Sequence, residues 1–126
     1  MQKAAEGARV AVLGASPKEE RYSFKAVRML KQHGFKPVPV HPAGHVVDGE
    51  PSLKSLDDVD QPVDTLTMYV GEKISSGELD RILKLKPRRV VFNPGAENES
   101  LAKDLEKNGI EVVRACTLVM LQTSQF

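Results

Sequence analysis

The feature that most constrains the fold of this chain is a regular alternation of two sequence patterns. Five short runs of β-branched and aliphatic residues are separated by longer segments in which apolar residues recur at helical spacing. Runs of the first kind are typical of buried strands, and segments of the second kind are typical of helices that cover a sheet. The five expected strands are residues 9–13, 36–41, 64–70, 89–92 and 110–113.

Strands and helices that alternate in this way form a mostly parallel sheet with helices on both faces. Because the crossovers between parallel strands are right-handed, we expect an α/β fold. Its core is a doubly wound, mostly parallel, five-stranded Rossmann-like sheet in three α/β/α layers. The sequence contains no internal repeat, and its 126 residues fit a single domain, residues 1–126.

Local signals set the expected ends of the helices. Ser23 is the expected N-cap of the first helix, and Gly34 is its expected C-terminal stop. The second helix is expected from Ser75 or Ser76 to residue 85. The third helix is expected over residues 98–108, where Gly109 ends it.

The remaining segments differ from this regular pattern. Pro37 and Pro39 remove two backbone donors from the second strand, so we expect it at an edge of the sheet or partly irregular. The connection 42–62 is rich in glycine and proline, with one helical turn expected at 52–56. The tail 117–121 is too apolar to stay wholly exposed, so we expect it to pack on the domain's own sheet or in a homodimer contact.

Composition excludes several classes of protein. Hydrophobic residues make up 40% of the chain and charged residues 28%, as in ordinary globular domains. No apolar run approaches the ~18–20 residues that span a bilayer, and the first residues lack the apolar core of a secretory signal. A net charge of +1 gives no general attraction to nucleic acid or membrane. The single cysteine, Cys116, rules out internal disulfides and suits a reducing cytoplasm. Together these properties predict a cytoplasmic protein without nucleic-acid or membrane partners.

The expected fold also predicts where a ligand binds. Doubly wound sheets bind ligands beyond the carboxyl ends of their strands, at the point where the winding reverses. Four segments follow strands at that end, and we expect them to share one crevice: residues 14–23, 41–45, 69–73 and 93–98. Cys116 follows the fifth strand and is expected near the same end.

The loop after the first strand has the residues of an anion site. Gly14 permits a sharp turn and a close approach of backbone to a ligand. The helix that follows offers unpaired N–H groups and a partial positive charge. Ser16 adds a hydroxyl donor, and Lys18 and Arg21 add two cations. This loop is a candidate cradle for a pyrophosphate, although an ordinary strand-to-helix turn with solvated charges has the same pattern. It does not have the P-loop pattern of nucleotidases.

The end of the second strand distinguishes between cofactors. An NAD site has an acidic residue there to bind the ribose hydroxyls. In this chain His41 and Pro42 end the strand, and no carboxylate comes before Asp48. The absence of negative charge suits a ribose that carries a phosphate, such as the 3′-phosphate of coenzyme A or the 2′-phosphate of NADP. NADP normally also requires an arginine at this turn, and the turn contains none.

These motifs, in this order, resemble a known family. Residues 12–17, 21–23, 40–42 and 93–99, together with Cys116, are similar to the small stand-alone CoA-binding proteins. Those proteins are relatives of the CoA-binding domain of succinyl-CoA synthetase. The resemblance extends from about residue 10 to 120. The chain has histidine at 41 and asparagine at 93, where the family commonly has asparagine and glutamine, and it lacks an arginine often found after the third strand.

The resemblance implies a site for coenzyme A or an acyl-CoA. The first loop would bind the pyrophosphate, the turn at 41–42 would lie beside the adenosine, and the turn at 93–95 would lie toward the pantetheine arm. A family cysteine stands at position 116, near where a pantetheine thiol would end. The cofactor-binding residues implied are Gly14, Ala15, Ser16, Pro17, Lys18, Arg21, Ser23, His41, Pro42, Asn93, Pro94, Gly95 and Cys116.

The sequence contains no recognisable catalytic set. His41 and His45 lack a reliable third ligand, so we predict no metal site. Glu97 and Glu99 fall at the start of a helix, where they complement its dipole better than they form an acid–base pair.

The first hypothesis is therefore a non-catalytic CoA-binding module that serves as a carrier, sensor or regulatory protein. The alternatives are a component of an NAD(P)-linked oxidoreductase that requires a partner chain, and a ligand-free Rossmann domain that acts as an interaction surface. Cys116 is either a reactive thiol or a buried apolar residue.

Overall fold

A five-stranded parallel sheet forms the centre of the protein. The computed structural model describes residues 2–126, and its strands are in the order β2-β1-β5-β6-β7. All four neighbouring pairs are parallel. This arrangement confirms the expected doubly wound α/β fold. The strands are β1 (Arg9–Leu13), β2 (Lys36–Val40), β5 (Thr65–Met68), β6 (Arg89–Phe92) and β7 (Glu111–Arg114).

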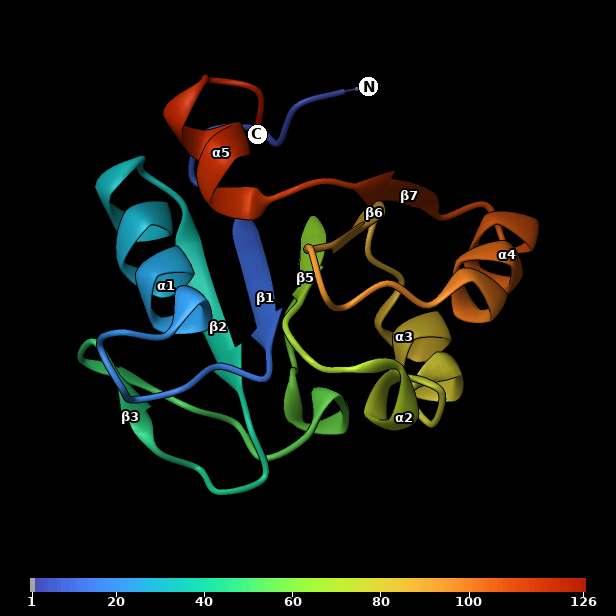
Figure 1. Ribbon diagram of the computed structural model, residues 1–126, viewed down its shortest axis with the longest axis horizontal. Helices are drawn as coiled ribbons and strands as arrows, with labels where there is room; N and C mark the ends of the chain where they lie inside the picture. The colour runs from blue at the N-terminus through green and yellow to red at the C-terminus, as the bar shows by residue number, and fades with distance from the viewer. Residues whose placement is uncertain (1) are drawn as a thin grey trace.

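Helices cover both faces of this sheet (Figure 1). On one face, α1 (Tyr22–Gln32) and α5 (Thr117–Gln122) pack on the side chains of Val10 and Val12. On the other face, α3 (Leu79–Leu85) and α4 (Glu99–Lys107) pack on Ala11 and Leu13. Successive residues of β1 therefore point into two separate cores, which explains why this strand is apolar throughout.

The connection between β5 and α4 differs from the prediction. Instead of one helix from residue 75 or 76, the chain forms a short helix, α2 (Glu72–Ser75), and then α3. Gly77 lies between the two helices, where the Ser75 hydroxyl is fully buried and accepts a hydrogen bond from Asn98. The helical spacing was recognised correctly, but the break was missed because this contact joins residues 23 positions apart in the chain.

The predicted start of α1 was also wrong. Arg21 is the N-cap, its backbone is extended, and no side chain caps the helix. Ser23 lies in the first turn, and its hydroxyl instead accepts the backbone N–H of Ser16 at 3.0 Å. Ser23 therefore holds the preceding loop in place.

The connection after β2 contains a small hairpin that the sequence did not reveal. It pairs β3 (Val46–Val47) with β4 (Glu50–Pro51). Asp48 at its tip has a φ of 49°. Its carboxylate forms ion pairs with Arg28 at 3.0 Å and Lys31 at 3.1 Å. These two cations hold the pKa of Asp48 below its usual range. The hairpin is thus fastened to α1.

Other parts of this connection agree more closely with the prediction. β2 is an edge strand, as its two prolines indicated. The expected helical turn is present, but as a 3-10 turn, η1 (Leu56–Asp58), rather than at 52–56. The Ser55 hydroxyl begins this turn by accepting the backbone N–H of Asp57 at 3.1 Å.

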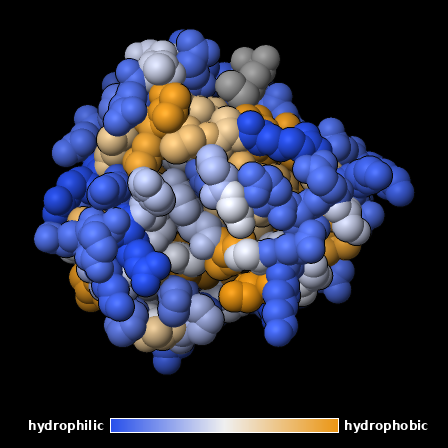
Figure 2. All heavy atoms as spheres, in the orientation of Figure 1, coloured by the Kyte–Doolittle hydropathy of each residue, from blue (hydrophilic) through white to orange (hydrophobic). Residues whose placement is uncertain are grey.

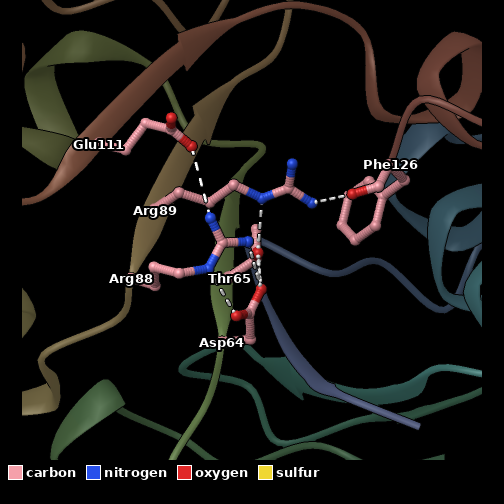
Figure 3. Close-up of polar contacts among 6 residues, drawn as sticks. All are labelled: Asp64, Thr65, Arg88, Arg89, Glu111 and Phe126. Atoms are coloured by element: carbon pink, nitrogen blue, oxygen red, sulfur yellow. Dashed lines mark hydrogen bonds and ion pairs between the residues drawn. The ribbon is translucent and has the colours of Figure 1, made fainter. Parts of the chain in front are cut away.

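The edge of the sheet where β5, β6 and β7 begin contains a buried guanidinium (Figure 3). Arg89 is fully buried and donates to the Thr65 hydroxyl at 2.7 Å and to the carbonyl of Phe126 at 2.6 Å. Its guanidinium also lies 4.3 Å from the centroid of the Phe126 ring. Burial lowers the pKa of Arg89. Because these contacts join β5, β6 and Phe126, Arg89 stabilises the fold at the edge of the sheet opposite the carboxyl ends of its strands.

The apolar tail packs on the protein's own core. Met120 and Leu121 of α5 are buried in the cluster that also contains Leu30 of α1. One side of α5 remains outward, since Val119 is 52% exposed. Apolar residues gather over α5 in the upper part of Figure 2. Of the two expectations for the tail, intramolecular packing is therefore realised.

Candidate nucleotide-binding site

The winding of the chain reverses between β1 and β5. The chain leaves β1 toward α1 on one face and leaves β5 toward α2 and α3 on the other, so a crevice forms at the carboxyl ends of these neighbouring strands. In Figure 1 the loop after β1 runs along the lower edge of the sheet, beside the hairpin that contains β3. Two adjoining hollows occupy this crevice.

The first hollow, here named the basic hollow, has a volume of about 500 Å³. Its cationic or potentially cationic side chains are Lys18, Arg21, His41 and His45, and no carboxylate is among the residues that line it. A hollow lined in this way has a positive local potential although the whole chain is nearly neutral. Its lining is Gly14, Ser16, Pro17, Lys18, Arg21, Tyr22, Ser23, His41, His45 and Tyr69.

The second hollow, here named the apolar hollow, is larger, at about 660 Å³. It shares Gly14, His41 and Tyr69 with the basic hollow, so the two are continuous. Most of the other residues around it are apolar, and a few polar side chains stand among them. The apolar lining comprises Leu13, Val40, Pro42, Leu56, Val70 and Ile74, and the polar lining comprises Lys54, Ser55, Glu78 and Arg81.

Gly14 is required by the packing of the protein itself. Its φ is +89°, a conformation that favours glycine. A Cβ at this position would lie 2.7 Å from a methyl carbon of Val70 and 2.8 Å from the carbonyl oxygen of Tyr69. We expected this glycine to allow a ligand to approach the backbone. The structure adds a reason that is independent of any ligand, because the loop passes directly over the end of β5.

The rest of the first loop presents few free donors. Ala15 is fully buried in the core under α1, so only its backbone is available to a ligand. Ser16 uses its backbone N–H on Ser23, and its hydroxyl oxygen accepts from the backbone of Lys18 at 3.1 Å. The Ser16 hydroxyl hydrogen can still be donated. Pro17 and Lys18 are exposed at the mouth of the basic hollow.

His41 is oriented by a local contact at the end of β2. Its Nδ1 accepts the backbone N–H of Ala43 at 3.0 Å. In the neutral ring the proton is therefore on Nε2, which can donate. The ring centroid of His45 is 6.2 Å away, and Pro42 is exposed beside it. Across residues 2–126, no group of three or more His, Cys, Asp or Glu side chains is arranged to hold a metal ion.

Asn93 has a structural role that sequence reasoning did not identify. Its side chain is buried and donates to the Thr67 hydroxyl at 2.7 Å and to the carbonyl of Met68 at 2.8 Å. Its oxygen accepts the backbone N–H of Thr117 at 2.8 Å. These contacts tie β5 and α5 to the end of β6. The amide of Asn93 is therefore already occupied.

The turn after β6 lies apart from the two hollows. Pro94 and Gly95 are exposed, and neither of them lines either hollow. The N–H of Gly95 donates to the Glu97 carboxylate at 2.8 Å, which fixes the turn. The expected crevice is thus formed mainly by the first three of the four predicted segments.

Cys116 is half-buried and immediately precedes α5. It lines neither hollow, but it lies close enough to Tyr69 to influence the charge of that residue. Burial raises the pKa of the Tyr69 phenol, a hydrogen bond with Thr117 opposes this rise, and the nearby Cys116 side chain adds to it. Cys116 is therefore near Tyr69, a residue that borders both hollows.

Several residues of the hollows were missed at the sequence level. Tyr69 belongs to a segment that was predicted to enter the crevice, and Ile74, which directly follows that segment, could have been inferred from the end of the third strand. Glu78 and Arg81 could not, because the break between α2 and α3 had no clear sequence signal.

The chain belongs to the CoA binding domain family, whose sequence profile matches residues 8–122. A solved structure of an uncharacterized protein has a TM-score of 0.91 and 41% identity, over 98% of this chain and 100% of that one. The protein cell-free ID.343 from Thermus thermophilus has a TM-score of 0.85 and 29% identity, over 95% of this chain and 91% of that one. The uncharacterized protein YneT of Bacillus subtilis (strain 168) is 24% identical over 105 residues, 83% of this chain and 78% of that protein. The resemblance noted in the sequence is thereby confirmed. Within residues 2–126, no helix has the length and apolar character needed to cross a membrane.

Proposed function

We propose that this protein binds coenzyme A or an acyl-CoA without catalysing a reaction, and that it acts as a carrier, sensor or regulatory protein. The observation that carries this proposal is the basic hollow at the switch point, which has no acidic lining and continues into the apolar hollow. A nucleotide that bears several phosphates and an apolar base matches this pairing of surfaces. Membership of the CoA binding domain family supports coenzyme A as that nucleotide.

The pyrophosphate is assigned to the first loop. The start of α1 has no side-chain cap, and the loop that leads to it lines the basic hollow. Free N–H groups at a helix N-terminus bind anions through both hydrogen bonds and the helix dipole. The Ser16 hydroxyl, Lys18 and Arg21 add one donor and two cations beside them.

The adenosine is assigned to the end of β2. His41 borders both hollows and Pro42 lines the apolar one. The adenine then occupies the apolar hollow, while the 3′-phosphate stays near the cations of the basic hollow. His41 and His45 lie on the phosphate side, where Nε2 of His41 can donate.

The pantetheine arm is assigned to the turn after β6 and to Cys116. Because the side chain of Asn93 is occupied, its contribution there is to shape the turn. Pro94 and Gly95 are exposed and can contact the arm directly. Cys116 is near Tyr69, which borders both hollows.

Further parts of this proposal concern the whole molecule. We propose that residues 1–126 act as one domain, that the protein works in the cytoplasm, and that its partner is a CoA compound rather than nucleic acid or a membrane. The outward side of α5, with exposed Val119, is available for a homodimer contact. No specific feature favours an NAD(P)-linked role, since the end of β2 carries no acidic residue for a ribose.

A thermal-shift comparison of coenzyme A, dephospho-CoA, NAD and NADP tests the proposal. Coenzyme A should stabilise the protein most, and dephospho-CoA less because it lacks the 3′-phosphate. A ligand at 100 times its Kd adds about 2.7 kcal/mol to the free energy of unfolding by mass action. Greater stabilisation by NAD than by coenzyme A would refute the proposed function.

A further inference from the structure

Glu78 is an acidic side chain in an unfavourable position. It directly precedes α3, lines the apolar hollow, and its side chain is only 17% exposed. Its Oε2 atom is buried and has no hydrogen-bond partner among the described residues. Its Oε1 atom lies 3.7 Å from the Arg81 guanidinium, which is too far for a hydrogen bond. Burial raises the pKa of the Glu78 carboxyl.

Arg81 offsets the charge of Glu78 only through this ion pair, because its hydrogen bonds go to other groups. It donates to Asp57 at 3.2 Å and to the carbonyl of Gly77 at 3.3 Å. A carboxylate withdrawn from water without hydrogen bonds costs free energy, and native proteins keep few such groups. Two other described side chains carry a buried oxygen without a hydrogen-bond partner, Ser52 and Glu111, and neither lines the two hollows.

The surroundings of Glu78 define what could satisfy it. Apolar side chains such as Leu13, Val40 and Val70 line the same hollow, and these suit the faces of a planar ring. A carboxylate accepts hydrogen bonds and cannot donate them. The ring must therefore carry an N–H donor on its edge. The terminal torsion of a glutamate is soft, so a carboxylate oxygen can turn toward the hollow at little cost.

We infer that Glu78 recognises the adenine of the bound nucleotide by accepting a hydrogen bond from its 6-amino group. This inference rests on the proposed function and extends it by naming a residue that determines base specificity. The ligand supplies the hydrogen bond that the free protein lacks. A hydrogen bond to a charged group contributes enough binding free energy that a base without the donor should bind about tenfold more weakly or worse.

Paired ligands and paired variants test this contact. Binding of adenosine 3′,5′-bisphosphate and of purine riboside 3′,5′-bisphosphate, in which hydrogen replaces the 6-amino group, is measured by calorimetry. The wild type should prefer the adenosine ligand by about tenfold or more. Glu78→Ala should bind the two ligands equally, and Glu78→Gln, which retains a neutral acceptor, should show an intermediate preference. Glu72→Ala is the matched control, because Glu72 is an exposed acid of α2 that lines neither hollow, and it should keep the full preference.

The stability of the same variants separates recognition from folding. Glu78→Gln should unfold at the same temperature as the wild type or higher, because it removes a largely buried charge whose Oε2 atom has no hydrogen-bond partner. Equal binding of the two ligands to the wild type, or an undiminished preference in Glu78→Ala, would overturn the inference while leaving the proposed function intact. If neither coenzyme A nor either bisphosphate binds to the wild type, both proposals fail.

Discussion

Replacing Gly14 by alanine should destabilise the protein even when no ligand is present. The backbone at this position has a φ of +89°, and a side chain held there costs on the order of 1–3 kcal/mol. The new Cβ would also lie 2.7 Å from Val70 and 2.8 Å from the carbonyl oxygen of Tyr69. The second neighbour is backbone, so relief requires the end of β5 or the loop to shift, which adds about 1–3 kcal/mol. The expected loss is therefore about 2–6 kcal/mol, out of a total of about 5–15 kcal/mol for a typical domain.

Chemical denaturation of matched variants measures this loss. Gly34→Ala is the control, because Gly34 has a similar φ of +85° but nothing within 4 Å of the added Cβ. Gly14→Ala should lose more stability than the control by about the cost of the clash. A loss of 3 kcal/mol corresponds to a fall of about 11 °C in Tm, from the usual entropy of unfolding per residue. If the two variants were equally stable, the close packing over Tyr69 would not explain this glycine.

Three further predictions concern charge and the thiol. Arg21→Ala should weaken coenzyme A binding and reduce its dependence on salt, since one cation is lost from the basic hollow, whereas Lys103→Ala on the exposed side of α4 should do neither. Burial raises the pKa of the Asp64 carboxyl, but hydrogen bonds from Arg88 and Thr65 outweigh this effect and hold the pKa below its usual range. The ionised Asp64 therefore stabilises the folded protein above the unfolded pKa of about 4, and this stabilisation disappears as the pH falls through the folded pKa. Denaturation curves of Asp64→Asn and the wild type should thus differ at pH 7 and converge in acid. Coenzyme A disulfide should add one CoA to Cys116 in intact-mass spectra, and faster as the pH rises, because the thiolate is the attacking species; reaction only of the unfolded protein would assign this thiol to the core.

The sequence alone determined the elements of the fold, because apolar periodicity is a local property. The predicted strands at 9–13 and 89–92 have the bounds that the structure shows. The helix predicted at 98–108 forms as α4 between its two caps, and the Asn98 side chain accepts the N–H of Leu101 as an N-cap should. The alternation of strands and helices then left a parallel, doubly wound sheet as the expected arrangement. For the same reason the position of the crevice at the ends of β1, β2 and β5 could be predicted.

Only the tertiary structure decided which side chains are free to act in that crevice. Hydrogen bonds between distant parts of the chain occupy Asn93, through Thr67 and Thr117, and divide the predicted second helix through Ser75 and Asn98. Glu78 acquires its position in the same way, since its Oε2 atom is buried without a hydrogen-bond partner beside a hollow built largely from other elements. The residue types were visible in the sequence, but whether each polar group is satisfied depends on neighbours that only folding brings together.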